Sequence, residues 1–433
     1  MKKLFNVFIL ALVLVSALSA QGSGETASSR DATVLTVTYA TGDTTTKEAV
    51  HAIVEKFNSS QSDYVIQENL SISTGAYLDS LKTLNASGQM PDFFECRDVP
   101  TFVRAGMLAP LPEDLLDEFT STIKVYGTTY TAPFVAAYPH MILYNRKLFR
   151  EYGINEDPKT YSDFLSICEE IKTKTGMAPM AAGVADIWHI GFLFNYYLAN
   201  YATGNNPDFV SQLYTGEAKF DTPEMIDAMS RLQYLFENYM EKGFMSTKES
   251  QLVSLLVGEK AAMIFTGSWT ISSILEADPE FEIGFFPIPD DEGSILLQGG
   301  AQAQGWALTT KAAEDPDKVE GFKAFVRFFM ADENYKEFLA ATNAFPTKDI
   351  EYETTELMSE IIEMNNKYDK LLIWNQGVGA NELPPSYRNW VYKKVQEMLT
   401  GKLSPEQLVK DMDEEWSVAT RDFNPTELVM ADL

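Results

Sequence analysis

Side chains that could do acid–base chemistry are numerous in this chain, but no pattern singles any of them out. The three histidines, His51, His140 and His189, share neither helical nor turn spacing, so they indicate no metal site. The sequence contains no HExxH, paired-cysteine, EF-hand, GxSxG or P-loop pattern. Paired carboxylates could hydrolyse glycosides, yet 62 acidic residues make any chosen pair uninformative. We therefore expect no enzyme activity, no cofactor and no metal, and keep a secreted glycoside hydrolase as an alternative.

Aromatic side chains beside polar loop residues point to a different chemistry. An indole ring packs against the C–H face of a sugar, while nearby carboxylates and amides bind the hydroxyl groups. Four tryptophans lie close to Gly, Ser, Asp or Asn rather than within a helical stripe: Trp188, Trp269, Trp306 and Trp374. Any one of them could instead belong to the core, because tryptophan is highly buried on average. As a group they favour a carbohydrate-binding site.

The elements that would position such a site begin with alternating strands and helices. Val34–Tyr39, Tyr64–Ile66 and Asp92–Glu95 have strand patterns, and helical patterns separate them. This alternation predicts an α/β unit with a largely parallel sheet. Ligands collect at loops after the carboxyl ends of such strands, which are Thr41–Asp43 and Glu95–Asp98 here.

A second α/β unit follows, and one unusual segment leads into it. Strand patterns recur at Ala178–Val184, Ala261–Phe265, Ile283–Ile288 and Gln298–Thr309, and the chain beyond Glu314 is mostly helical. The segment Tyr126–Phe149 is extended and apolar, but Pro133 and Pro139 interrupt it. Proline cannot donate to a sheet ladder, so it suits a place where the chain leaves one sheet. We expect this segment to carry the chain between the two units.

The first twenty residues have the features of an export signal. Lys2 and Lys3 precede the uncharged run Leu4–Val15, and small residues suitable for cleavage follow. Because the run is shorter than a membrane-spanning helix, we expect removal of residues 1–20, with residues 21–33 as a flexible leader. The two cysteines, Cys96 and Cys168, allow one disulfide but no disulfide framework.

The charge balance restricts the partners. The formal net charge is −28, and it becomes −30 when Lys2 and Lys3 are removed with the signal. Such a surface repels phosphate backbones and anionic membranes. We therefore expect no nucleic-acid partner.

Four segments together resemble the family 1 extracellular solute-binding proteins, the sugar-capturing components of ABC importers. Their motifs occur in the family's order at 88–92 with 105–111, at 130–133 with 143–149, at 258–263 with 267–269, and at 399–407. The third pair contains Gly258-Glu259-Lys260-Ala261-Ala262-Met263 and Gly267-Ser268-Trp269. In the last segment, Leu408 replaces the alanine that the family pattern has. The chain also lacks the lipid-modified cysteine of the family's lipoprotein members.

The resemblance implies an α/β fold of the two-lobed periplasmic-binding-protein type (type II), with a ligand cleft between lobes and crossing strands as a hinge. Lobe 1 would comprise residues 34–137 and 302–343, and lobe 2 residues 138–301 and 344–433. This division places Cys96 and Cys168 in different lobes, so no disulfide is expected.

The resemblance also implies a set of ligand-contacting residues in the loops at the strand ends and on the crossings. They are Thr41, Asp43, Glu95, Arg97, Asp98, Tyr138, Trp188, Trp269, Gln302, Gln304, Trp374 with Asn375, and Arg388. Phe94 is a further aromatic near the end of a strand, and it could equally face the core.

The function implied is substrate binding for an ABC transporter. The protein would capture a carbohydrate, an oligosaccharide, by hinge closure and deliver it to permease subunits in the membrane. It would act as a monomer in the periplasm or at the extracellular face of the cell membrane. A binder of a polyol or glycerol phosphate is the other alternative, although the net charge and the single Arg97 in the lobe 1 site disfavour an anion.

Overall fold

The computed structural model describes residues 32–41, 44–70, 77–120, 122–136, 138–299, 304–371, 373–374 and 377–423. The strands are β1 (Thr33–Thr38), β2 (Tyr64–Glu68), β3 (Phe93–Cys96), β4 (His140–Asn145), β5 (Ala178–Ala181), β6 (Ala261–Gly267), β7 (Ile283–Phe286), β8 (Leu296–Leu297), β9 (Gly305–Leu308) and β10 (Asp369–Lys370). The helices are α1 (Thr44–Ser60), α2 (Tyr77–Ala86), α3 (Val99–Arg104), α4 (Arg146–Tyr152), α5 (Tyr161–Thr175), α6 (Ile190–Leu198), α7 (Phe209–Thr215), α8 (Pro223–Tyr239), α9 (Leu252–Val257), α10 (Thr270–Ala277), α11 (Pro316–Met330), α12 (Asp332–Thr342), α13 (Glu356–Lys367), α14 (Pro385–Leu399) and α15 (Pro405–Ala419).

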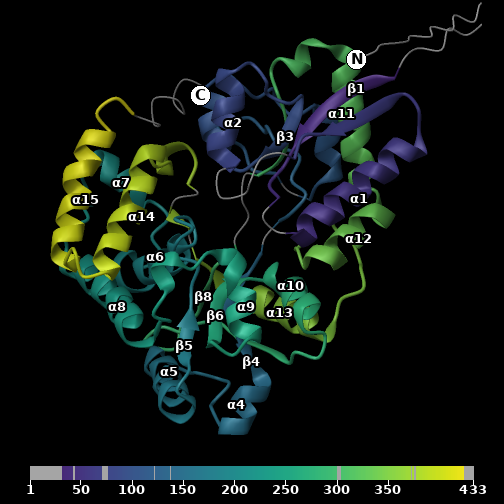
Figure 1. Ribbon diagram of the computed structural model, residues 1–433. Helices are drawn as coiled ribbons and strands as arrows, with labels where there is room; N and C mark the ends of the chain where they lie inside the picture. The colour runs from purple at the N-terminus through teal and green to yellow at the C-terminus, as the bar shows by residue number, and fades with distance from the viewer. Residues whose placement is uncertain are drawn as a thin grey trace, which may run out of the picture.

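The first sheet is largely parallel, as the alternation of its strands predicted. Its order is β2-β1-β3-β9, and β1 runs parallel to both β2 and β3. The last strand, β9, returns from far along the chain and pairs antiparallel with β3, placing Trp306 opposite Glu95. Figure 1 shows α1, α11 and α12 beside this sheet, and α11 contacts β1.

The second sheet is mixed rather than parallel. Its order is β5-β6-β4-β7, with β4 antiparallel to both of its neighbours and β5 parallel to β6. Every residue of β4 and β6 is buried, which fits their near-continuous apolar sequences. The helices α5 and α9 pack on β5 and β6, and α14 and α15 stand against each other at one side (Figure 1).

Local signals set several helix ends. Thr160 begins α5 with a capping box, in which its hydroxyl accepts from the Asp163 N–H and the Asp163 carboxylate accepts from the Thr160 N–H. Asn145 caps α4, and Gly153 ends that helix in the left-handed region at φ 59°.

Each of the two four-stranded sheets contributes to two apolar core clusters, the larger of which we call the first core and the second core. In the first core, Trp306 stacks on Phe134 with ring centroids 4.7 Å apart, and α11 supplies Phe322 and Phe325. The core of the second sheet is larger and includes aromatic residues of α6, α8, α14 and α15. Cys96 and Cys168 are both buried and both free, and they lie on different sheets' cores, as expected.

Two segments that lead from one sheet to the other pair with each other near both sheets. Ala132 pairs with Trp306 of the first sheet, whereas His140, eight residues later, pairs with Gln298 at the second. Gly299 packs on the backbone of Tyr138 and Pro139, and Gly305 packs on Ala132 so closely that a Cβ would overlap its carbonyl oxygen. The proline-interrupted segment therefore leads from one sheet to the other, as predicted.

A third connection between the two halves follows α12. Ala344 belongs to the first core, and the Thr347 hydroxyl donates to the Pro133 carbonyl oxygen at 2.8 Å. Ile350 and Tyr352 also pack against that core. Phe345, next to Ala344, belongs instead to a core cluster with Met141 and Leu143 of the second sheet. The chain after α12 therefore contacts the cores of both sheets before it enters α13.

The C-terminal part of the chain reaches back to the first half. Glu382 is 4% exposed, and its carboxylate accepts hydrogen bonds from Arg104 of α3 and from the Tyr126 hydroxyl. Its backbone carbonyl accepts from Tyr214 at 2.7 Å. A buried ion pair therefore connects α3 to the segment that precedes α14.

The predicted export signal, residues 1–20, lies outside the described residues, as does most of the predicted leader. Among the helices of the described ranges, none combines the length and the hydropathy needed to cross a bilayer.

Candidate functional site

One group of predicted site residues lies at the carboxyl ends of β1 and β3. Glu95 is 7% exposed, and its two carboxylate oxygens accept from the Ala40 backbone N–H at 2.9 Å and from Arg97 Nε at 2.6 Å. The Tyr77 hydroxyl donates to the Glu95 carbonyl oxygen at 2.8 Å. Glu95 thereby ties the end of β1 to the end of β3, and Thr41 is half-buried directly after Ala40.

Arg97 and Asp98 follow Glu95, and the structure brings Asp98 together with a distant predicted residue. Asp98 Oδ2 lies 3.9 Å from Nη2 of Arg388, which is in α14. The Arg97 side chain remains 40% exposed. Burial lowers the pKa of its guanidinium, but the Glu95 carboxylate outweighs this and raises the pKa above its ordinary value. Both arginines are paired with carboxylates.

A second group is aromatic and lies where β4 begins and β6 ends, at one end of the inner strands of the second sheet. Tyr138 contacts Trp269 edge to face, with ring centroids 5.4 Å apart. Phe192 lies between the two predicted tryptophans, 6.1 Å from Trp269 and 5.4 Å from Trp188. Trp188 is 37% exposed, whereas Trp269 and Tyr138 are half-buried. We call Tyr138, Trp188, Phe192 and Trp269 the aromatic platform.

The two groups approach each other through Arg97 and Tyr138, whose side chains are close enough to interact electrostatically. Tyr138 also packs against the first core, although it lies on the crossing to the second sheet. Tyr138 therefore contacts both the first core and, through Trp269, the aromatic platform.

Two histidines beneath the platform were not assigned to the site from the sequence. His140 lies 4.2 Å from the Phe192 ring and 5.1 Å from the Trp269 ring, and His189 lies 5.3 Å from Trp188. Burial lowers the pKa of each imidazole to about 3, so both are neutral at pH 7. The sequence could have indicated them, because each histidine follows a predicted aromatic site residue by one or two positions.

Three other aromatic residues that the sequence singled out are buried: Trp306, Trp374 and Phe94. Trp306 is a core residue at 1% exposure, which corrects its inclusion among the sugar-stacking tryptophans. Trp374 is 6% exposed and packs on Phe194 and Tyr387 in the second core, so its ring is not presented beside the platform. Phe94 is fully buried, which confirms the core alternative.

Of the four remaining predicted site residues, the structure describes one. Gln304 is half-buried immediately before β9. Asp43, Gln302 and Asn375 lie outside the described residues. In the part of the chain that is described, no group of three or more His, Cys, Asp or Glu side chains is arranged to hold a metal ion.

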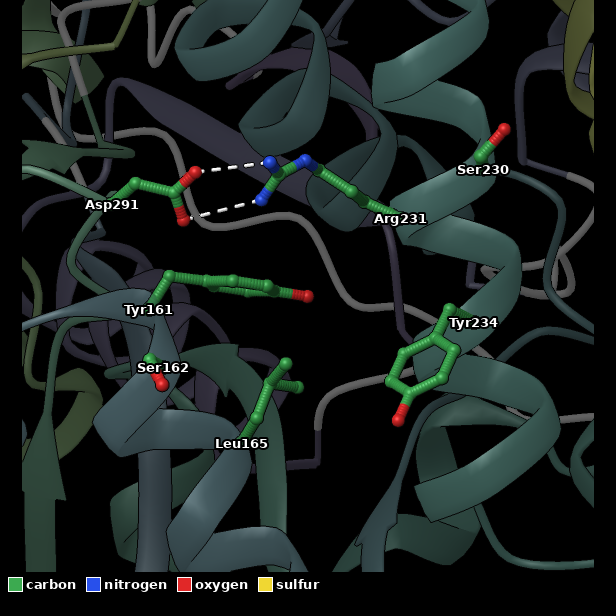
Figure 2. A pocket seen from close by; sticks show the side chains of 7 residues that line it. All are labelled: Tyr161, Ser162, Leu165, Ser230, Arg231, Tyr234 and Asp291. Atoms are coloured by element: carbon green, nitrogen blue, oxygen red, sulfur yellow. Dashed lines mark hydrogen bonds and ion pairs between the residues drawn. The ribbon is translucent and has the colours of Figure 1, made fainter.

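A separate pocket lies on the outer side of the second half, between α5 and α8. Its volume is about 360 Å³, and Figure 2 shows Tyr161 and Tyr234 on opposite sides of it. Arg231 forms an ion pair with Asp291 across one edge, with Nη2 and Oδ2 3.0 Å apart. None of the predicted site residues lines this pocket. Its charged pair is already satisfied, and its other polar lining groups are the hydroxyls of Tyr161, Ser162, Ser230 and Tyr234.

The family profile described as bacterial extracellular solute-binding protein matches residues 41–336. The chain is 25% identical to the multiple sugar-binding protein of Streptococcus mutans, over 57% of this chain and 61% of that protein. It is 25% identical to the melibiose/raffinose/stachyose-binding protein of Bacillus subtilis, over 79% and 80% of the two chains. The chain spans less than two thirds of the first two relatives that it matches, 61% of the Streptococcus mutans protein and 64% of a second protein.

Solved structures of the same fold cover nearly the whole described chain. A chitin oligosaccharide binding protein, 26% identical, superposes with a TM-score of 0.78 over 90% of this chain and 99% of its own. A sugar transporter protein from Bacillus licheniformis, solved with stachyose, is 21% identical with a TM-score of 0.70 and covers 89% of this chain and all of its own. At 21% identity, the likeness to the Bacillus licheniformis protein shows a shared fold alone.

Proposed function

The chain belongs to the bacterial extracellular solute-binding proteins, and from this premise we propose that it captures a carbohydrate for an ABC importer. The ligand would be an oligosaccharide held between the two halves of the fold. The support comes from the relatives, two of which are named for binding sugars, and from the chemistry of the platform.

The observation that carries the proposal is the pairing of the aromatic platform with the polar strand ends. Trp188 is exposed over 37% of its surface beside the half-buried rings of Tyr138 and Trp269, which together offer broad faces for sugar C–H groups. Arg97 and Asp98 supply charged hydrogen-bonding groups from the first sheet. An apolar wall with a few placed polar groups is the usual composition of a small-molecule site.

The pairing of the cations favours a neutral sugar over an anionic solute. Arg97 donates to Glu95 at 2.6 Å, and Arg388 lies 3.9 Å from Asp98. Each guanidinium is therefore balanced by a carboxylate, so neither arginine offers a phosphate an uncompensated positive charge. A glycerol phosphate would displace one of these pairs and leave a carboxylate facing the anion.

The same contacts disfavour a hydrolase. A catalytic acid needs a carboxyl group that can release its proton to the leaving oxygen. Both oxygens of Glu95 are occupied by Ala40 and Arg97, and the nearby Asp98 faces Arg388. Binding without turnover is the simpler use of this arrangement.

Capture would proceed by closure of the two halves around the crossing segments. Closure can be driven only by contacts that the sugar makes better in the closed form than in the open one. The platform and the polar strand ends stand on different sheets, so one ligand touching both would supply such contacts. The closed form, exported and monomeric, would then present both halves to permease subunits in the membrane.

Two alanine substitutions test the site. Trp188→Ala and Trp269→Ala should each weaken oligosaccharide binding about tenfold to a hundredfold, the loss expected when a buried aromatic contact is truncated. Tyr234→Ala is the matched control, because this exposed tyrosine lines the outer pocket instead. Affinity measured by calorimetry that falls only for Tyr234→Ala would move the site to the outer pocket.

A further inference from the structure

Trp269 is held by a hydrogen bond from its own ring edge. Its Nε1–H donates to Oε1 of Glu249 at 2.8 Å, and Glu249 lies in the turn that precedes α9. Gly267 makes room for the indole ring of Trp269, because a Cβ at this position would overlap the ring. The indole therefore occupies the space beside Gly267 at the end of β6, with its only polar group already bonded.

Glu249 is held in turn by the loop that carries Trp188. Its backbone N–H donates to Oδ2 of Asp186 at 2.8 Å, two residues before Trp188. The Ala185 N–H donates to the Thr247 carbonyl oxygen at 2.9 Å. The loop before Trp188 and the turn that contains Glu249 are thus joined by backbone and side-chain hydrogen bonds.

A glycine makes this junction possible. A Cβ on Gly183 would lie 2.7 Å from the Glu249 nitrogen and 2.8 Å from its Cα. Such distances do not occur for real side chains, so any larger residue at 183 would push the two segments apart. The continuous path Asp186–Glu249–Trp269 then fixes the spacing between two tryptophans that are 81 positions apart in the sequence.

We propose that Glu249 is a positioning residue for the aromatic platform, holding Trp269 at a fixed distance and angle from Trp188. This inference rests on the proposed function, because it assigns the platform to sugar binding. With its N–H bonded to Glu249, Trp269 contributes a ring surface and no hydrogen bond to the ligand. It therefore selects the C–H face of a pyranose, while hydroxyl recognition falls to the first sheet. A platform fixed in advance binds without the entropic cost of ordering two large rings.

The first arm of the test needs no sugar. In ¹⁵N-tryptophan-labelled protein, the indole N–H resonance that Trp269→Phe removes is that of Trp269. We expect Glu249→Ala to shift this resonance and speed its hydrogen exchange, with Glu249→Gln giving an intermediate shift because an amide oxygen still accepts. Glu360→Ala, an exposed glutamate of α13, is the control. An unmoved Trp269 resonance in Glu249→Ala would overturn the proposal.

The second arm measures affinity for stachyose and a chitin oligosaccharide by calorimetry. Glu249→Ala should weaken binding about tenfold, Glu249→Gln less than threefold, and Glu249→Ala should add nothing in a Trp269→Phe background. Wild-type affinity in Glu249→Ala with a shifted resonance would refute the positioning role. If the wild type binds neither sugar nor any other of the panel below, the proposed function fails, and the first arm still decides whether Glu249 orients Trp269.

Discussion

The two histidines beneath the platform make a quantitative prediction about acid stability. Each is buried as a neutral imidazole, with its pKa lowered from an ordinary value of about 6.5 to about 3. In the unfolded chain they regain the ordinary pKa, so below pH 6.5 the unfolded state binds more protons than the folded state. Stability from these groups is therefore fully present above pH 6.5 and is lost as the pH falls toward 3.

The magnitude follows from the size of the pKa difference. One pH unit below the unfolded pKa costs about 1.4 kcal/mol per histidine. At pH 4.5, two units below, each histidine should cost about 2.7 kcal/mol of unfolding free energy. Many carboxylates also titrate in this range, so the effect has to be isolated as a difference between wild type and His189→Gln.

The assay is denaturant unfolding followed by tryptophan fluorescence at pH 7, 6, 5 and 4.5. The stability of His189→Gln relative to wild type should improve steadily as the pH falls, by about 2.7 kcal/mol from pH 7 to 4.5. His51→Gln is the control, because this histidine is on an exposed face of α1 and pairs with Glu68. A difference between wild type and His189→Gln that stays constant with pH would refute the assignment of His189 as a buried neutral residue.

Two further predictions concern other buried groups. Glu382→Ala should lower the unfolding free energy by about 3 kcal/mol, because it leaves Arg104 without its buried partner. Glu282→Ala, which breaks an exposed ion pair, should have little effect in the same denaturation assay. Equal effects of the two substitutions would contradict the buried pair. Cys96 and Cys168 should not react with a thiol reagent in the native protein, because burial raises the pKa of both thiols, and both should react in denaturant; a native thiol titre above zero would contradict their burial.

The sequence predicted the features that depend on local patterns. Strand patterns located β1 and β3, and the prolines on either side of Tyr138 marked a crossing between sheets. The loops after β1 and β3 followed from the general rule about parallel strands. These patterns depend on residues close together in the sequence, and in natural proteins such local preferences agree with the global fold.

What the sequence could not supply was burial and long-range pairing. Trp306 and Trp374 have the same small, polar neighbours as Trp188, so only the packing shows that they are core residues. The contact of Asp98 with Arg388 joins positions 290 apart, and the bond from Trp269 to Glu249 joins a turn to a strand end. Antiparallel return of β9 likewise depends on contacts made far along the chain.

The most direct test of the central claim is titration calorimetry with a panel of solutes. The panel should contain raffinose, stachyose, maltotriose and a chitin oligosaccharide, with a monosaccharide, a polyol, glycerol phosphate and a peptide for comparison. We predict saturable binding of at least one oligosaccharide, tighter than any other class, with the sugar recovered intact by chromatography. Binding confined to glycerol phosphate or the peptide, cleavage of the sugar, or no heat with any solute would contradict the account.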